Sequence, residues 1–265
     1  MIRLGLCAAL VGGLLLAPVG GFGGPLPEGY VRLADVAPGI ATDMRYARAF
    51  NFTDGPVPGY DSPTCILTQT TAKALVKAEA ALNAQGFALI VFDCYRPQRA
   101  VDFFAEWAAQ EESPDTRPPG AVPALDTPPD QPTAKDVFFP DFAKSELHAS
   151  GFIARTSGHS LGHTVDVGLK TKGHALTRPD FADSGRCDGP FATRAPESDL
   201  DLGTAFDCFS ALSAHDAKVS PAARQNRATL RKAMAEAGFV AYGKEWWHYR
   251  NARDPVKQAQ TFPVD

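Results

Sequence analysis

The sequence has no excess of positive charge and no internal repeat. Its 26 lysines and arginines are outnumbered by 30 aspartates and glutamates, which gives a net charge of -4. Nucleic-acid-binding surfaces usually carry a basic excess, so we expect no nucleic-acid partner. The sequence also has no C-x-x-C pair. What is present, 265 residues of which 45% are hydrophobic, suits a single globular domain.

Long hydrophobic runs are also missing, except at the N-terminus. After Arg3, the run Leu4–Leu16 is apolar or small, and small residues with a proline follow it. This order is typical of a secretory signal peptide, and the run is shorter than the roughly 20 residues of a membrane span. An uncleaved anchor is the alternative. We therefore expect a signal peptide at 1–23, a single domain at 24–265, and an exported protein, periplasmic or secreted, without membrane contact after signal removal.

Four cysteines remain once the expected signal peptide is removed. They are Cys65, Cys94, Cys187 and Cys208. An even number of cysteines in an exported chain permits two disulfides, with three possible connectivities. The local choice joins Cys187 to Cys208 and leaves Cys65 with Cys94, but the sequence leaves the pairing open. A four-cysteine metal site is disfavoured because no C-x-x-C pair exists.

Three helices and one buried strand follow from periodicity and end signals. Thr68–Gly86 is rich in Ala, Leu and Lys between a residue suited to the N-cap and a terminal glycine. Ser220–Gly238 begins with serine and proline and ends in glycine. Phe87–Asp93 is a continuous apolar run, which predicts a buried strand. Helical periodicity resumes in Pro97–Glu112.

The other segments indicate loops and further strands. Residues 112–135 are dense in Pro and Asp and predict a long surface loop, followed by a short helix over 138–151. The alternating residues 163–169 predict a strand, and 239–250 predict a strand, a turn and a strand. Helices and strands that mix without a strict repeat predict an α+β fold: a single domain with a mostly antiparallel sheet packed by helices.

The stretch SGHSLGHTVDVGL, residues 157–169, has two histidines four residues apart, the spacing of a helical zinc site. Its glycines and serines are weak helix formers, however, and the Thr and Val residues after them favour a strand. We therefore expect a turn at Gly162 that folds His159 toward the strand face of Asp166. There an imidazole and a carboxylate would converge, as a metal site requires. Strand parity places His163 on the opposite side.

A third ligand and an acid–base group are found together near the C-terminus. His248 in EWWHYR is the candidate ligand, and Glu245 stands three residues before it. Two histidines and a carboxylate leave a fourth position for water, whose pKa a metal lowers toward about 7. Glu245 could take the proton of that water and return it to a leaving amine. Arg96, just past the buried strand, could stabilise negative charge on a carbonyl oxygen.

These residues resemble a known family. Ser157-x-His159-x-x-Gly162-x-Thr164-x-Asp166 resembles the S-x-H-x-x-G-x-A-x-D motif of the zinc D-alanyl-D-alanine dipeptidase family of metallopeptidases, and of related D,D-carboxypeptidases. The residues EWWH, 245–248, match the E-x-W-H element of that family. Three further blocks favour the dipeptidases and extend the resemblance, in order, over nearly the whole mature chain: Arg45–Tyr60, Phe92–Val101 and Asp201–His215.

The resemblance implies hydrolysis of D-alanyl-D-alanine and similar small D,D-dipeptides, in cell-wall peptide turnover or recycling. It implies one Zn²⁺ per chain, held by His159, Asp166 and His248. It also implies that Glu245 is the catalytic base and that Arg96 stabilises the tetrahedral intermediate. The nearest alternative is a D,D-carboxypeptidase that acts on longer peptidoglycan stem peptides. A non-catalytic wall-binding or zinc-binding protein is a third reading, which the complete set of ligands, base and arginine argues against.

Substrate-binding residues are implied as well. Asp207 matches the position that meets the free ammonium of the substrate, and Ser157 matches a serine close to substrate and metal. The alternative role for Asp207 is a helix or turn cap, and the alternative role for Ser157 is a turn hydroxyl. Three positions depart from the family pattern. Thr164 replaces an alanine, and its hydroxyl could bond Asp166 or narrow the pocket; Leu161 stands where the family often has an arginine; and His163 replaces a small residue. The sequence indicates no oligomeric state.

Overall fold

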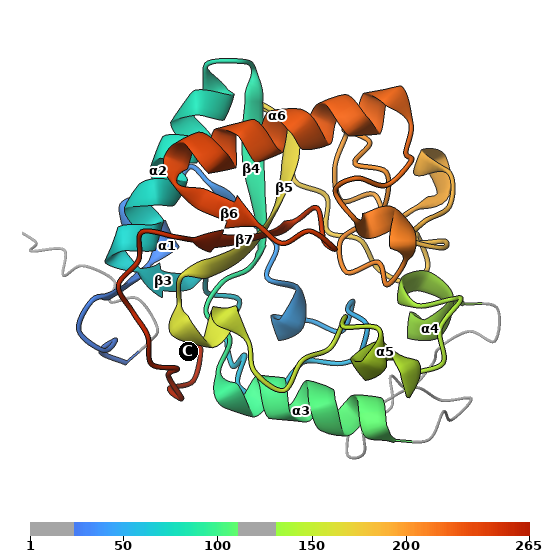
Figure 1. The fold of residues 1–265 in the computed structure, drawn as a ribbon, viewed down its shortest axis with the longest axis horizontal. Coiled ribbons are helices and arrows are strands. Elements are labelled where there is room, and N and C mark those ends of the chain that lie inside the picture. Colours follow the sequence, from blue (N-terminus) through green and yellow to red (C-terminus); the bar gives the residue numbers. More distant parts are fainter. Residues whose placement is uncertain (1–23, 111–130) are drawn as a thin grey trace, which may run out of the picture.

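The computed structural model describes residues 24–110 and 131–265. The expected signal peptide, 1–23, and most of the expected Pro-rich loop, at 111–130, lie outside the described residues. A five-stranded sheet in the order β2-β4-β5-β7-β6 forms the centre, and β1 and β3 form a small second sheet (Figure 1). Strands and helices alternate irregularly along the chain, so the predicted α+β class is confirmed.

The elements have the following bounds. The strands are β1 Tyr30–Arg32, β2 Ala41–Thr42, β3 Ile66–Thr68, β4 Phe87–Asp93, β5 Thr164–Thr171, β6 Phe239–Ala241 and β7 His248–Asn251. The α-helices are α1 Leu33–Val36, α2 Gln69–Asn83, α3 Gln98–Ala109, α4 Ala134–Phe138, α5 Glu146–Ala149 and α6 Pro221–Ala237. Single turns of 3-10 helix are η1 Arg45–Ala47, η2 Gly158–Leu161, η3 Phe191–Thr193 and η4 Ala211–Ser213. In the larger sheet β2 pairs parallel with β4, and the other three pairings are antiparallel.

The two long helices begin at the residues that their end signals predict. The hydroxyl of Thr68 accepts a hydrogen bond from the backbone N–H of Thr71 at the start of α2, and Ser220 caps α6 in the same way. Gly238 ends α6 with a left-handed φ of 104°. The predicted end of α2 was too late, because the helix stops at Asn83 and Gly86, with φ 84°, belongs to the turn into β4.

The predicted extent of the Pro-rich loop is wrong at its C-terminal end. Helix α4 begins at Ala134, inside the segment expected to be loop. Its start is a capping box: the hydroxyl of Thr133 accepts from the N–H of Asp136, and the carboxylate of Asp136 accepts from the N–H of Thr133. The helix expected over 138–151 is wrong in its bounds, since α4 ends at Phe138 and only α5, Glu146–Ala149, is an α-helix in the rest of that segment.

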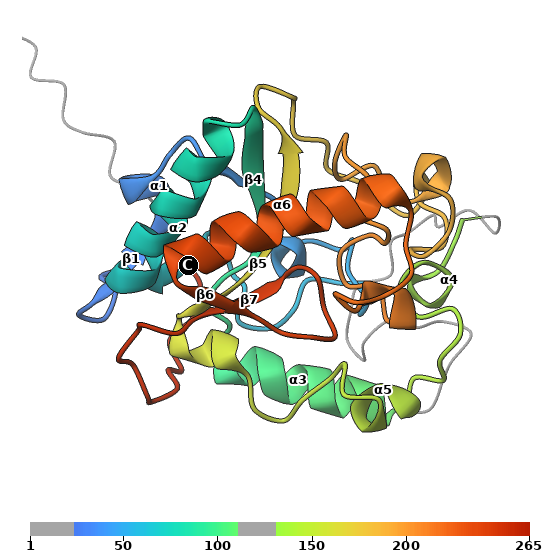
Figure 2. The same cartoon turned by 45° about the horizontal axis from the view of Figure 1, so that its top comes forward.

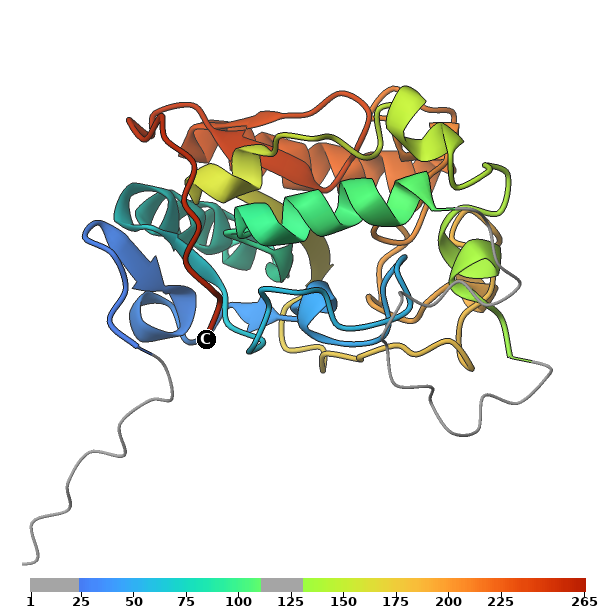
Figure 3. The ribbon, with the colours of Figure 1, turned by 90° about the horizontal axis from the view of Figure 1, so that it is seen from below.

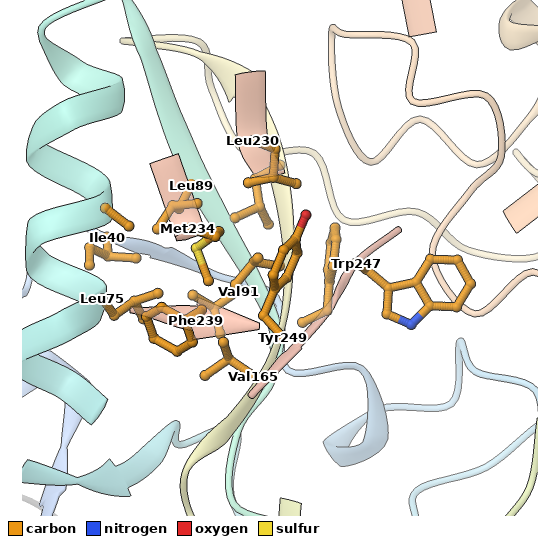
Figure 4. Close-up of a cluster of buried hydrophobic side chains, with 14 of the residues drawn as sticks. Ile40, Leu75, Leu89, Val91, Val165, Leu230, Met234, Phe239, Trp247 and Tyr249 are labelled. Atoms are coloured by element: carbon orange, nitrogen blue, oxygen red, sulfur yellow. The ribbon is translucent and has the colours of Figure 1, made fainter. Parts of the chain in front are cut away.

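One hydrophobic core lies between the larger sheet and the helices α2 and α6. These two helices pack against each other and cover one face of the sheet (Figures 1 and 2). Figure 4 shows how Leu75 of α2 and Leu230 and Met234 of α6 meet Val91 and Val165 of the central strands. This packing fixes which face of each strand points to the core. The residues next to these valines along their strands therefore point to the other side of the sheet.

A second, more aromatic core lies between η1, α3, α4, α5 and the segment near residue 209. Tyr46, Phe52, Phe104, Trp107 and Phe209 belong to it. Helix α3 runs along the lower edge of the molecule in Figure 1 and lies in the foreground of Figure 3. The candidate site described next lies where the two cores meet. Among the described residues, no helix combines the length and the apolar character that crossing a membrane requires.

Two disulfides connect parts of the chain near the boundary between the two cores. Cys65 is bonded to Cys94, at the end of β4, and Cys187 is bonded to Cys208. The structure therefore contains the local pairing, out of the three connectivities that the sequence allowed. Both bridges lie in the interior of the molecule.

Candidate metal centre and substrate cavity

Two of the expected ligands face each other across neighbouring strands. Asp166 of β5 is the direct cross-strand partner of His248 of β7, so both side chains stand on the same face of the sheet. His159 reaches them from η2, which ends at Gly162 with a left-handed φ of 71°. The structure thus has a turn at Gly162, as expected, and not a helix that carries His159 and His163 side by side.

The three side chains place their donor atoms within one small sphere. Nε2 of His159 lies 3.3 Å from Oδ2 of Asp166 and 3.4 Å from Nδ1 of His248, and Nδ1 of His248 lies 3.1 Å from Oδ1 of Asp166. These three residues form the one group of His, Cys, Asp and Glu side chains with metal-binding geometry in the described part of the chain. His159 and Asp166 are buried, while His248 is partly open to solvent.

The other ring nitrogen of His159 is held in place by the backbone. Nδ1 lies 2.7 Å from the carbonyl oxygen of Cys94 and 3.3 Å from a carboxylate oxygen of Asp93. A proton on Nδ1 is therefore shared with two oxygen atoms, and Nε2 keeps its lone pair toward Asp166 and His248. Orienting groups of this kind fix the tautomer of a ligating histidine.

Asp93 is a residue of this site that sequence reasoning missed. It accepts hydrogen bonds from the hydroxyl of Tyr60 at 2.7 Å and from Arg96 at 2.8 Å. In a regular strand Asp93 would share the face of Val91, which points into the first core. The register of β4 against β5 shifts between these two residues, so that Asp93 lies opposite Asp166 instead. The alternation of the sequence contains no sign of this shift.

Arg96 lies beside the three donors, held by its own surroundings. Its Nη2 atom is 3.7 Å from Oδ2 of Asp166, and its guanidinium lies over the rings of Tyr46 and Phe104 at 5.0 and 5.1 Å. Burial lowers the pKa of Arg96, but Asp93 and the other anionic neighbours outweigh burial and keep the pKa well above its usual value. Arg96 is therefore a fixed positive charge at the site.

Glu245 lies in the turn between β6 and β7. Its Oε2 atom is 3.4 Å from Nδ1 of His248. Burial raises the pKa of Glu245 to about 7, with Asp166 adding to the rise and the cationic neighbours opposing it. A carboxyl group with this pKa can both accept and donate a proton near neutral pH.

The close contact among the three candidate ligands shifts the pKa values of Asp166 and His248. Burial works against ionisation of Asp166, but the adjacent His159 and His248 outweigh it and lower the pKa of Asp166. Burial likewise opposes a charged His248, and the close contact with the charged Asp166 outweighs it and raises the pKa of His248. Metal binding needs a neutral imidazole, so it competes with this proton.

These groups open onto a cavity of about 280 Å³. Its polar lining includes most of the residues that the sequence singled out: Arg96, Ser157, Asp166, Asp207, Glu245 and His248. Its apolar lining is largely aromatic: Tyr46, Phe52, Phe104, Phe152, Phe209, Tyr242 and Trp247, with Ile153. The cavity therefore combines a carboxylate-rich end with an apolar wall.

Asp207 is held in the cavity lining in a defined way. Its Oδ2 atom accepts a hydrogen bond of 2.9 Å from the hydroxyl of Tyr46, a second residue that sequence reasoning did not single out. Burial, with Asp166 next, raises the pKa of Asp207 well above its usual value. A cation brought next to Asp207 would reverse this effect.

Ser157 and the residues that depart from the family pattern have structural partners. The hydroxyl of Ser157 accepts from the N–H of His159 at 3.2 Å, as a turn hydroxyl does, and Ser157 also lines the cavity. The hydroxyl of Thr164 lies 3.2 Å from Nδ1 of His163. The expectation that Thr164 bonds Asp166 or narrows the pocket is wrong, because Thr164 contacts His163 and is absent from the cavity lining.

The sequence was compared with known proteins. The family model described as D-ala-D-ala dipeptidase matches residues 27–124 and 175–264. A D-alanyl-D-alanine dipeptidase of Enterococcus faecalis is 32% identical over 231 residues, which cover 87% of this chain and 95% of that protein. One of Streptomyces coelicolor is 33% identical over 222 residues, covering 83% and 90%. One of Escherichia coli is 26% identical over 235 residues, covering 88% of each.

The segments matched by the family model bracket the site. They contain Arg96, Asp207, Glu245 and His248, while His159 and Asp166 lie in the interval between them. The placement of these two residues therefore depends on the SGHSLGHTVD stretch and on the geometry described above. On the extent of the family match and the coverage of the relatives, this chain belongs to the D-ala-D-ala dipeptidase family of peptidases.

Proposed function

We propose that this protein is a zinc-dependent dipeptidase that hydrolyses D-alanyl-D-alanine and similar D,D-dipeptides. The observation that carries the proposal is the meeting of His159, Asp166 and His248 at one cavity that also holds Glu245 and Arg96. The relatives that bear the name D-alanyl-D-alanine dipeptidase support the substrate. Turnover or recycling of cell-wall peptides is the process in which this activity fits.

The donor set suits zinc. Imidazole nitrogen and carboxylate oxygen are its usual ligands, and atoms bound tetrahedrally to zinc lie about 3.3 Å apart. The distances from Nε2 of His159 to Oδ2 of Asp166, 3.3 Å, and to Nδ1 of His248, 3.4 Å, agree with this value, and one donor atom of each residue lies within 4.8 Å of the others. Oδ1 of Asp166 is buried and has no partner with hydrogen-bond geometry, as expected of an oxygen that a cation completes. When bound, zinc supplies Lewis acidity, which lowers the pKa of water and polarises a carbonyl group.

Glu245 carries the proton in the proposed reaction. Its largely buried carboxylate takes a proton from the attacking water and passes it to the nitrogen of the leaving amino acid. A pKa near 7 lets the same group serve in both directions. Arg96 donates to the carbonyl oxygen of the substrate as that oxygen gains negative charge, and Asp93 keeps the guanidinium in place.

The free amino group of the substrate is assigned to Asp207. Its carboxylate lines the cavity and is held by Tyr46, so an ammonium placed beside it would be paired in a largely buried setting. Ser157, at the start of η2, lies on the same cavity and is assigned a polar contact to the substrate. This arrangement selects a substrate whose free amino group belongs to the residue on the N-terminal side of the cleaved peptide bond.

One assay tests the function. The metal-replete protein is given D-Ala-D-Ala, its N-acetyl form, and L,D- and L,L-dipeptides, with and without chelator. We expect turnover of D-Ala-D-Ala that chelator abolishes and zinc restores, and a strong loss on N-acetylation. Failure to hydrolyse any dipeptide would remove the proposal. Efficient cleavage of an N-acylated tripeptide ending in D-Ala-D-Ala would instead identify a D,D-carboxypeptidase.

Export is proposed together with this function. The two disulfides, Cys65–Cys94 and Cys187–Cys208, support an oxidising compartment. Mass spectrometry of protein recovered from the periplasm or medium of the source cell tests this. We expect a mature chain that lacks the first 23 or so residues and contains no free thiol.

A further inference from the structure

Asp207 adopts a backbone conformation that needs external support. Its φ of 59° is in the left-handed region, which only two non-glycine residues of the described chain adopt. This conformation is unfavourable for a residue with a Cβ atom, and it persists when neighbouring groups hold it. Asp207 is also buried, so its carboxylate is fixed by the protein and not by solvent.

Both chain neighbours of Asp207 are anchored. Cys208 is bonded to Cys187, and the N–H of Phe206 donates to Oε1 of Glu197 at 2.6 Å. The other oxygen of Glu197 accepts from Nη2 of Arg45 at 2.7 Å. Glu197 therefore connects the backbone of Phe206, the residue before Asp207, to a distant part of the chain, the 3-10 turn η1.

Arg45 is almost completely buried, with 1% of its side chain exposed. Its Nε atom donates to Oδ2 of Asp43 at 2.7 Å, and its guanidinium carbon lies 5.1 Å from the ring centre of Phe92 and 5.7 Å from that of Phe206. A charge buried in this way is costly unless its partners are in place. The ion pair with Glu197 can thus move little.

The residue after Arg45 acts on the same aspartate. Tyr46 donates its hydroxyl to Oδ2 of Asp207 at 2.9 Å. Two consecutive residues of η1 therefore act on Asp207. Tyr46 holds its carboxylate, and Arg45, by way of Glu197, holds the backbone of the residue before it. Neither Arg45 nor Glu197 belongs to the cavity lining, so any effect they have on the substrate is indirect.

We propose that Arg45 and Glu197 are positioning residues that set the selectivity of the cavity for a free amino group. The inference rests on the proposed role of Asp207 in pairing with the substrate ammonium. With the Arg45–Glu197 pair intact, the Asp207 carboxylate stays where an ammonium can meet it. Without the pair, the left-handed turn relaxes and the counter-charge is displaced, while the metal ligands and Glu245 stay in place.

The test compares Glu197→Gln and Glu197→Ala with the wild-type holoenzyme. Glutamine keeps an acceptor for the N–H of Phe206 but loses the charge that pairs with Arg45, and alanine loses both. We expect the KM for D-Ala-D-Ala to rise in the order wild type, Gln, Ala, by about tenfold or more for alanine, with kcat changed by less than about threefold. Zinc content should be unchanged.

An analogue without the amino group separates selectivity from general damage. Propionyl-D-alanine, tested as a competitive inhibitor, has no charge for Asp207 to pair with, so its Ki should stay the same in both variants. Glu79→Gln is the matched control, because Glu79 also accepts from a backbone N–H, that of Leu89 at 2.8 Å, but lies on α2 outside the cavity lining. Its KM and Ki should equal those of the wild type.

A second comparison asks whether the effect passes through Asp207. In an Asp207→Asn background the further change Glu197→Gln should have no effect on KM, because the charge to be positioned is already gone. An unchanged KM in both Glu197 variants, a Ki that rises with KM, or an effect that persists in the Asp207→Asn background would each overturn the proposal. If the wild type does not cleave D-Ala-D-Ala, the proposed function has failed instead. If Glu197→Ala does not fold, the glutamine variant decides.

Discussion

At the scale of single residues, Glu245 is the group whose surroundings fit a proton carrier. Replacing it by glutamine keeps the size and removes the ability to take a proton. We expect Glu245→Gln to keep its zinc and to lose about 10²- to 10⁴-fold in kcat for D-Ala-D-Ala. Kinetics with parallel metal analysis measure this. Glu236→Gln, at an exposed position of α6, is the control, and a Glu245→Gln protein with most of its activity would remove the proposed role.

The two histidines of the SGHSLGH stretch should differ in their effect on the metal. Nε2 of His159 faces Asp166 and His248, whereas Nδ1 of His163 lies beside the hydroxyl of Thr164, outside the donor group. We expect His159→Ala to lose zinc on dialysis and His163→Ala to retain close to one equivalent. Metal analysis after gel filtration reports the occupancy. Equal loss from both variants would show that the ligand assignment is wrong.

Whether a single site residue could be predicted from the sequence depends on whether local structure or the tertiary fold determines its position. Residue types and strand parity were enough to propose His159, Asp166 and His248, because a turn and two adjacent strands bring them together. Asp93 could not be found in this way, since its position depends on a register shift in β4. Tyr46 comes from a segment with no periodic pattern, and only the tertiary fold brings it to Asp207.

At the scale of elements, the turn that ends η2 controls the position of His159. Gly162 has a φ of 71°, and a Cβ atom added there would lie 2.4 Å from Cε1 of Tyr30, whose hydroxyl donates to the carbonyl oxygen of Leu161. A side chain at this position therefore meets both an unfavourable backbone conformation and a tyrosine ring that is held in place. The turn needs glycine for both reasons.

Gly162→Ala and Gly173→Ala form a matched pair that separates these two effects. Gly173 has a similar φ of 83°, but nothing lies within 4 Å of an added Cβ atom. Both changes should cost about 1–2 kcal/mol for the backbone, and Gly162→Ala about 1–3 kcal/mol more for the clash. Urea unfolding measures both, and zinc affinity should fall only for Gly162→Ala. Equal losses of stability would contradict the steric account.

Whole elements were predicted where a local signal marks both ends. Strand β4 and helix α6 match their expected ranges because an apolar run, a serine cap and a terminal glycine are local features. Helix α4 was missed because its capping box, from Thr133 to Asp136, has the composition of a polar loop. The order of the strands in the sheet depends on long-range pairing, such as β5 with β7, which local signals do not contain.

At the scale of the whole molecule, the site depends on the meeting of two cores. Two of the three candidate metal ligands, Asp166 and His248, stand on the larger sheet, whose other face packs on α2 and α6, while most of the aromatic wall belongs to the second core. Arg45 and Glu197 connect these regions, since Arg45 contacts the rings of Phe92 and Phe206 of the first core. The proposed substrate selectivity would therefore be coupled to packing across this boundary, which no short motif could have predicted.

Stability at mildly acidic pH should depend on His215, which lies away from the metal ligands. Burial, followed by the charges of Arg231 and Arg227, lowers its pKa from 6.5 to about 4. Its Nε2 atom is buried without a hydrogen-bond partner among the described residues, and its ring packs edge-on against Tyr249. The folded protein therefore resists a proton that the unfolded chain accepts.

The sign of the effect follows from proton binding. Between pH 6.5 and 4 the unfolded state holds the extra proton, so His215 removes stability as the pH falls through this window, by at most about 1.4 kcal/mol per pH unit. Above this window it contributes no slope. The raised pKa values of Asp207 and Glu197 act in the opposite direction, so the total dependence of stability on pH is not informative by itself.

The comparison with His215→Gln isolates the contribution of the histidine, because these carboxyl groups are the same in both proteins. We expect the free energy of unfolding, from urea titrations at pH 7 and pH 5, to fall less for His215→Gln than for the wild type. Parallel loss in the two proteins would show that His215 is protonated equally in the folded and unfolded states.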